Sequence, residues 1–204
     1  MKTLLLALFC LALMVGCNSE PAKPAEKPQP KPPEYVTGRI AFQKMFVSAR
    51  GWARDAQPFR LESQPTSDAT GKEGKAAVWR ASFASAAQHG VKPWTWSGTE
   101  VSDAPSRGVN PGSEDNYNPD NASTTVFDMQ FLKVDSDKAF EVAQKHGGDK
   151  ILEKTPDTPI VYMLDWSRPT NELIWHVYYG GNRDQAKLRA QVNATTGEFI
   201  RLEK

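Results

Sequence analysis

The side chains of this sequence best suited to acid–base or metal chemistry are three histidines. Their spacing does not bring them together in a metal-binding motif. His89, His146 and His176 lie far apart in the chain. None belongs to an HExxH motif or an i,i+4 pair, which would place two zinc ligands on one helix face. His89 lies by a predicted turn and His146 at a predicted helix end, where a cation suits the helix dipole. His176 lies on the polar face of a predicted strand. We therefore expect it at the surface, and we predict no metal site.

Motifs of the common catalytic machineries are missing from the sequence. It contains no Gly-x-Ser-x-Gly elbow, no P-loop and no GxGxxG fingerprint. Asp165 and Glu172 flank a predicted hairpin turn that contains Arg168, which is ordinary strand-end chemistry. A carboxylate pair for glycoside hydrolysis is defined by its separation in space, so a hydrolase with an unmarked carboxylate site stays an alternative. We predict a protein that is not an enzyme, with no catalytic residues and no cofactor.

Segment 114–121 (Glu-Asp-Asn-Tyr-Asn-Pro-Asp-Asn) is the most suggestive polar cluster. Hard oxygen ligands of this kind are those that calcium prefers. The segment lacks the glycine and the final glutamate of an EF-hand loop, and Asn, Asp and Pro are also the residues of ordinary turns. We favour a plain loop over a calcium site.

The candidate binding residues are three tryptophans, Trp79, Trp94 and Trp96. Trp94 and Trp96 alternate along a predicted strand, so both indoles lie on one of its faces. Trp79 belongs to the strand before it. Exposed aromatic side chains mark many recognition surfaces. The alternative is that the three indoles lie in the core, because a domain without disulfides needs large anchors.

Residues 1–16 have the pattern of an export signal. Lys2 precedes an apolar run from Thr3 to Val15, which matches the charged and apolar regions of a signal peptide. The run is shorter than the ~20 residues that cross a bilayer. It ends in Met14-Val15-Gly16-Cys17, which resembles the lipobox of bacterial lipoproteins. The resemblance implies that Cys17 is lipidated, begins the mature chain and makes the membrane a partner.

Lipidation of Cys17 would leave no free thiol, because Cys10 lies in the removed leader. Cysteine nucleophiles, cysteine-based zinc sites and disulfides are then excluded. The lipidated cysteine and the proline-rich residues that follow it (17–34) form a predicted extended tether, with a PxxP ligand for a partner as the alternative. Asn18 is not the aspartate of inner-membrane retention. We therefore expect a lipid-anchored protein of the cell envelope, on the outer membrane facing the periplasm if two membranes are present.

The composition of the chain narrows the kind of partner. The formal net charge is +1 over 204 residues, so a nucleic-acid partner is not indicated. The mature chain from residue 17 is long enough for one compact domain or two small ones.

The hydrophobic periodicity predicts an α+β fold of small antiparallel sheets, each packed by a helix. Residues 38–55 read as an amphipathic helix. A second helix begins at Ser136 as its N-cap and closes at Gly147-Gly148. Alternation favours antiparallel strands with one buried face. The predicted strands are Phe59–Glu62, Val78–Phe83, Val91–Trp96, Val126–Val134, Ile160–Trp166, Leu173–Tyr179, Leu188–Val192 and Phe199–Ile200.

These elements fall into a first α+β unit (35–100), a loop (101–125) and a second α+β unit (126–204). Each unit is a helix followed by strands, so the chain is readable as two tandem helix-plus-three-strand units. Val78-Trp79-Arg80 would correspond to Ile174-Trp175-His176. A true duplication and a chance register of two α+β stretches both stay open.

Three segments of the second unit carry a family resemblance. They are the helix Lys138–Ala143, the strand Leu173–Tyr178 and the ending Ala190–Ile200, with its Thr-Gly-Glu step. With them, residues 136–202 resemble the PepSY domain, a helix-plus-sheet module of peptidase propeptides and exported bacterial proteins. Asn193 stands where the family usually has aspartate.

The PepSY resemblance implies a non-catalytic binding module outside the cytoplasm that inhibits or regulates a peptidase. The first unit would be a divergent copy of the same domain. The family has no shared catalytic residues, so none is transferred. The alternative function is that of a structural or accessory lipoprotein that holds a partner at the membrane. Both functions require a protein or peptide partner.

Overall fold

The computed structural model describes residues 31–203. The predicted signal peptide, Cys17 and most of the proline-rich segment lie outside the described residues. From Pro32 onwards the chain belongs to one compact unit. The two predicted units are therefore parts of a single compact body.

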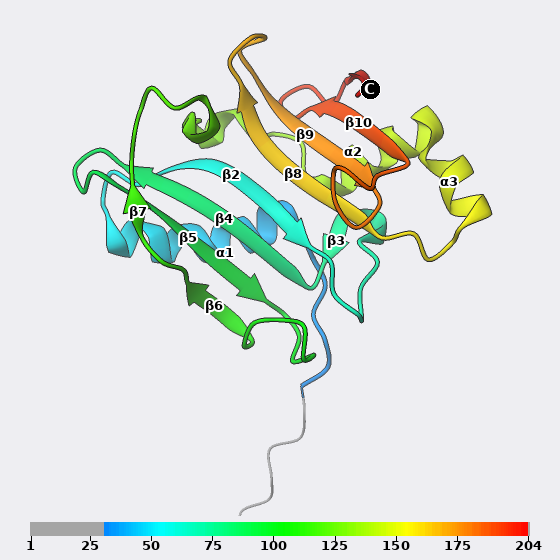
Figure 1. Cartoon of the computed structure of the whole chain (residues 1–204), viewed down its shortest axis with the longest axis horizontal. Helices are drawn as coiled ribbons and strands as arrows, with labels where there is room; N and C mark the ends of the chain where they lie inside the picture. The colour runs from blue at the N-terminus through cyan, green and yellow to red at the C-terminus, as the bar shows by residue number, and fades with distance from the viewer. Residues whose placement is uncertain (1–30, 204) are drawn as a thin grey trace, which may run out of the picture. The chain divides into compact units, whose positions relative to one another are not determined.

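A nine-stranded antiparallel sheet forms the centre of this body (Figure 1). Its strands are β2 (Gln57–Gln64), β4 (Val78–Ser85), β5 (Gly90–Ser97), β6 (Gly108–Pro111), β7 (Asp115–Asn116), β8 (Ile160–Ser167), β9 (Glu172–Tyr179), β10 (Leu188–Asn193) and β11 (Phe199–Leu202). Their spatial order is β11-β10-β9-β8-β2-β4-β5-β6, and β7 also pairs with β5. A separate small sheet joins β1 (Val36–Thr37) to β3 (Lys75–Ala76).

The long helices cover one face of the large sheet. In the view of Figure 1, α1 (Gly38–Trp52) and α2 (Ser136–Ala143) lie behind the sheet, and α3 (Asp149–Lys154) follows α2. Helix α1 packs on β4 and β5, and α2 packs on β9 and β10. The hydrophobic core lies between these layers, while the other face of the sheet carries no helix among the described residues. None of the helices between residues 31 and 203 is long and apolar enough to cross a membrane.

The α+β class is confirmed, but the expected separate small sheets are wrong. Strand β2 of the first half pairs directly with β8 of the second half, with Leu61 opposite Leu164. The Ser63 hydroxyl accepts a hydrogen bond from the Tyr162 N–H at 2.9 Å. Because this pairing joins the halves into one sheet, two independent helix-plus-three-strand units are not confirmed.

Two predictions about the middle of the chain are wrong. The expected loop 101–125 contains the short strands β6 and β7. The expected strand Val126–Val134 instead contains a 3₁₀ turn at Met129–Phe131. In this segment the Phe127 N–H bonds the Pro58 carbonyl at 2.9 Å, and Phe127 is buried. Its apolar side chains therefore fill the core from a non-strand backbone.

The second helix differs from its prediction at both ends. Asp135, not Ser136, is its N-cap, because the Asp135 carboxylate accepts a hydrogen bond from the Ser136 N–H at 2.7 Å. The Gly147-Gly148 pair does not end the helical segment. Gly147 adopts a positive φ of 111° in a turn between α2 and α3, and the chain then continues as α3.

The start of α1 depends on the same residues of the second half. The N–H of Gly38 donates to the Ser136 hydroxyl at 2.8 Å, and the N–H of Arg39 donates to Asp135 at 2.9 Å. Thr37, the N-cap of α1 by position, makes no capping hydrogen bond with its side chain. Asp135 and Ser136 therefore cap α1 from the other half of the chain, which supplies orphan donors of that helix with acceptors.

Two tryptophans occupy matching places in the two halves. The Trp79 indole N–H donates to the Val36 carbonyl at 3.0 Å, and the Trp175 indole N–H donates to the Val134 carbonyl at 2.9 Å. Each carbonyl precedes the start of a helix by two residues. The rings meet edge to face with centroids 6.4 Å apart. Each half thus ties its helix to its sheet through one buried indole.

Candidate functional site

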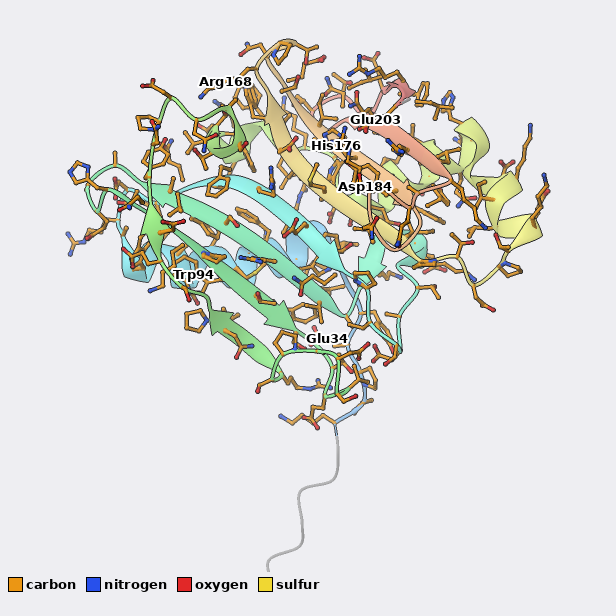
Figure 2. All side chains as sticks on the ribbon, in the orientation of Figure 1. Glu34, Trp94, Arg168, His176, Asp184 and Glu203 are labelled. Carbon is orange, nitrogen blue, oxygen red and sulfur yellow. The ribbon has the colours of Figure 1, made fainter. Side chains whose placement is uncertain are left out.

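A cluster of charged side chains around His176 lies on the face of the sheet opposite the helices. The Nδ1 of His176 lies 2.6 Å from a carboxylate oxygen of Glu203, and the Nε2 of His176 lies 3.1 Å from a carboxylate oxygen of Asp165. The side chains of His176, Asp165 and Glu203 are only 12%, 24% and 7% exposed. His176 therefore lies on the polar face of β9 as expected, but neighbouring side chains cover most of it. Figure 2 shows His176 and Glu203 close together on the half of the sheet that contains β8 to β10.

The alternation of β9 explains why His176 faces away from the helices. Trp175 and Val177 point into the core, so His176 and Tyr178 point to the opposite face. Asp165 comes from the neighbouring β8, where it lies opposite Ile174. This position places it diagonal to His176, within reach of a side chain.

Glu203 reaches the cluster from the segment that follows β11. Its N–H donates to the Arg189 carbonyl at 2.8 Å, which fixes the backbone beside β10. Its carboxylate then accepts a hydrogen bond from the Gln191 amide at 3.0 Å and pairs with Arg183 at 3.3 Å. With His176, three side chains from three segments hold this one carboxylate.

The two carboxylates determine the protonation of His176. Burial disfavours the charged imidazole, but the hydrogen bonds and charges of Asp165 and Glu203 outweigh it, so the pKa of His176 is raised. The hydrogen bond from His176 is the main reason that the pKa of Glu203 falls to about 2. The arrangement therefore favours an imidazolium between two carboxylates.

A cavity of about 250 Å³ adjoins the cluster. Met163, Ile174 and Ile200 supply apolar lining, and Arg183 and Arg201 supply cationic groups. A second hollow of about 380 Å³ is also lined by Glu203 and shares both arginines with the first.

Tyr178 also lines the first cavity, and its hydroxyl is unusual. The residue is 3% exposed, and its hydroxyl oxygen has no hydrogen-bond partner among the described residues. Burial is the main cause that raises the pKa of Tyr178, so the group is a neutral hydroxyl.

The tryptophans predicted as binding residues lie in the core instead. Trp79, Trp94 and Trp96 are 0%, 4% and 3% exposed and belong to the main hydrophobic cluster. Trp79 lies opposite Trp96 in the β4–β5 register, on the side of the sheet that faces α1. The three indoles thus present no exposed face, and the alternative of core anchors describes them.

Arg168 donates hydrogen bonds to carbonyl groups of loop 114–121. Arg168 donates from Nη2 to the carbonyl of Pro119 at 3.0 Å and from Nε to the Thr125 hydroxyl at 2.6 Å. Asn118 and Asn121 accept hydrogen bonds from backbone N–H groups two residues further on, as in ordinary turns. Within residues 31–203, no group of three or more His, Cys, Asp or Glu side chains is placed to hold a metal ion.

Other polar residues of the sequence lie apart from the cluster. His146 stacks on Phe199 with ring centroids 3.6 Å apart, on the helical side. Glu172 accepts a hydrogen bond from the Asn193 amide at 2.9 Å. Asp165 and Glu172 flank the β8–β9 hairpin turn that contains Arg168, as expected. Within this arrangement Arg168 bonds the 119–125 loop, and Asp165 bonds His176.

No family model and no curated protein matches the sequence. The fold is similar to the crystal structure of a putative lipoprotein from Clostridium difficile 630. The similarity has a TM-score of 0.52 and covers 80% of this chain and 91% of that chain at 11% sequence identity. At this identity the likeness concerns the fold alone. The PepSY resemblance of residues 136–202 stays a prediction.

Proposed function

We propose that this protein is a lipid-anchored, non-catalytic binding protein of the cell envelope, which recognises a protein or peptide with the helix-free face of its sheet. The observation that carries the proposal is the charged cluster around His176, which lines a cavity together with the apolar side chains of Met163, Ile174 and Ile200. Concave sites with apolar walls and a few fixed polar groups are typical of ligand binding.

The hydrogen bonds of His176 support a binding role over a catalytic one. A general base needs a ring nitrogen with a free lone pair within reach of the proton that it removes. Both ring nitrogens of His176 instead face carboxylate oxygens, at 2.6 and 3.1 Å. The imidazolium then positions Asp165 and Glu203 and is not available as a base.

The lipid anchor is proposed from the sequence, which carries a lipobox-like Met14-Val15-Gly16-Cys17. The protein of similar fold is itself described as a putative lipoprotein. Replacing Cys17 by serine should release the protein from the membrane fraction, because a lipid chain is the proposed anchor. For a cell with two membranes we propose the outer membrane, facing the periplasm, and recovery in the inner-membrane fraction would contradict that placement.

Regulation of a peptidase is the specific form of the proposal, and it rests on the PepSY resemblance alone. The second candidate is an accessory lipoprotein that holds a partner at the membrane. The two differ in a direct measurement, since a regulator changes the cleavage rate of a co-purified peptidase and an accessory protein leaves it unchanged.

Capture of partners from an envelope extract tests the binding face. We would compare the full chain with Arg183→Ala/Arg201→Ala, two arginines on the helix-free side, and with Lys145→Ala/Lys150→Ala, two exposed lysines on the helical side. A partner lost only with the arginine variant supports the proposed face. Partners that are equally retained, or lost with the lysine variant alone, contradict it.

A further inference from the structure

Tyr178 lines the cavity beside His176 and has an unpaired hydroxyl. Buried hydroxyl groups in folded proteins nearly always have a hydrogen-bond partner. Tyr178 is 3% exposed, lines the 250 Å³ cavity and has no partner among residues 31–203. Its neighbour His176, by contrast, has both ring nitrogens engaged. The fold thus leaves the hydroxyl of a cavity-lining residue without a partner.

The charges around the cavity favour an anion. Arg183 and Arg201 both line it, and the Arg183 side chain is 63% exposed. Together with the imidazolium of His176 they set three cationic groups against the carboxylates of Asp165 and Glu203. Guanidinium groups pair with carboxylates through two parallel hydrogen bonds. A planar anion can therefore be held at the side where the arginines lie.

Apolar side chains at the same cavity favour a ligand with an apolar part. Met163, Ile174 and Ile200 line it, and Ile174 is 3% exposed. A volume of about 250 Å³ is below the range of drug-sized sites. The cavity therefore suits a group about as large as one aliphatic side chain with its acid.

The chain itself provides an example of a carboxylate bound at this place. Glu203 accepts hydrogen bonds from His176 and Gln191 and pairs with Arg183. Glu203 lines two hollows, and Arg183 and Arg201 line both of them. The donors that bind the Glu203 carboxylate therefore lie next to space that can hold a second carboxylate.

We propose that the cavity beside His176 binds a carboxylate that carries a short aliphatic group, with the Tyr178 hydroxyl and the guanidinium groups of Arg183 and Arg201 as its donors. The inference rests on the proposed function and names the chemistry that its binding face recognises. The acid is either a free small molecule or the C-terminal carboxylate of a peptide that ends in an aliphatic residue.

Calorimetric titration of the full chain in detergent tests this assignment. The probes are N-acetyl-leucine, its neutral analogue N-acetyl-leucinamide, and a short peptide ending in leucine with either a free or an amidated C-terminus. We expect the free acids to bind at least about tenfold more tightly than the amides, because only the acids form charge-assisted hydrogen bonds. Tighter binding of the free-acid peptide than of N-acetyl-leucine supports a peptide terminus, and equal or weaker binding of the peptide supports a free small acid.

Two tyrosine variants test whether the acid binds at the Tyr178 hydroxyl. Tyr178→Phe removes a hydroxyl that has no partner in the fold, so the protein should stay folded while its affinity for the acid falls at least about tenfold. Tyr179→Phe is the matched control, since its hydroxyl accepts a hydrogen bond from Gln144 at 2.9 Å on the helical side. Its affinity should equal that of the wild type.

The proposal is overturned if acids and amides bind equally, if neither binds, or if Tyr178→Phe binds like the wild type. A failure of this kind is distinguishable from failure of the proposed function. If no acid binds but capture of a partner still depends on Arg183 and Arg201, the binding face stands and its ligand has another chemistry.

Discussion

The two halves of this sheet have the same buried tryptophan anchor and differ in the side chains on the helix-free face. Trp79 in β4 and Trp175 in β9 are both fully buried, and each bonds the carbonyl that precedes a helix by two residues. The next residue in each strand turns to the helix-free face. In the first half that residue is Arg80, and in the second half it is His176.

The surroundings of these two residues are different. Arg80 lies opposite Glu62 and Thr95 in its register, and it is half-buried at a hollow of about 360 Å³. His176 is fixed between two carboxylates and adjoins a cavity with an unsatisfied hydroxyl. Trp79 and Trp175 therefore occupy equivalent core positions, but of the residues that follow them only His176 belongs to such a cluster. Both halves contain a buried tryptophan that stabilises the fold. Only the second half contains the residues of the proposed ligand site.

The largest expected effects test the shared tryptophan anchor. Trp79→Ala and Trp175→Ala should each lower the free energy of unfolding by about 3–5 kcal/mol, because each leaves a large cavity in the core. The milder Trp→Phe variants keep most of the buried ring and lose the indole hydrogen bond. Denaturant unfolding with circular dichroism measures all four. A small loss at one tryptophan and a large one at the other would show that the positions are not equivalent.

The next effect tests the difference between Arg80 and His176. His176→Gln should cost about 1.5–3 kcal/mol, since it removes hydrogen bonds to two charged groups. Arg80→Gln should change stability by less than about 0.5 kcal/mol, as is usual at a partly exposed surface position. Equal losses in the two variants would mean that the cluster adds nothing beyond an ordinary surface residue.

A smaller effect is expected at the starts of the helices. Asp135→Ala should cost about 1–2 kcal/mol, the range of a strong N-cap, because Asp135 accepts hydrogen bonds from the N–H groups of Ser136 and Arg39. Thr37→Ala should be close to neutral, since the Thr37 hydroxyl caps nothing. Thermal unfolding of both variants provides the comparison. Similar losses would contradict the capping of α1 by the second half.

The smallest effect is a dependence of the His176 contribution on pH. The folded pKa of His176 is raised above its ordinary 6.5, so its stabilisation is complete below that value and is lost as the pH rises through the folded pKa. The pKa of Glu203 is lowered from 4.5 to about 2, so its stabilisation is present above pH 4.5 and is lost as the pH falls towards 2.

The cluster should therefore stabilise the protein most between about pH 4.5 and 6.5, and the His176 contribution should decline as the pH rises from there through its raised pKa. The difference in unfolding free energy between the wild type and His176→Gln should shrink on either side of this window. The same difference measured for Arg80→Gln is the control and should be flat. A constant gap for His176→Gln from acid to alkaline pH would contradict the assigned ion pairs.

Periodicity along the chain predicted the helix α1 and most long strands, because each of them buries one face. The partner of each strand was not predictable in the same way. The alternation in β2 shows which side is buried and says nothing about β8 as its neighbour. The segment Val126–Val134 misled for a related reason, since apolar residues such as Phe127 fill the core from a 3₁₀ turn as well as from a strand.

The candidate site was only partly readable from sequence. The side of β9 that His176 occupies was correct, because Trp175 and Val177 fix the alternation. Its burial depends on Glu203, a single acidic residue beyond the last strand that no local pattern connects to His176. The tryptophans show the opposite problem. Their chemistry suits both a recognition surface and a core, and only the packed structure places Trp94 and Trp96 inside.

The pairing of β2 with β8 has a consequence for the kinetics of folding. Ser63 and Tyr162, which it brings together, are 99 residues apart in the chain, and contacts of such long range slow the search for the native topology. Until β8 arrives, β2 has one open edge, and unpaired strand edges are sites of aggregation. A chain synthesised from its N-terminus exposes that edge until β8 has been made. It would then depend on rapid completion, or on a chaperone, to reach its folded form.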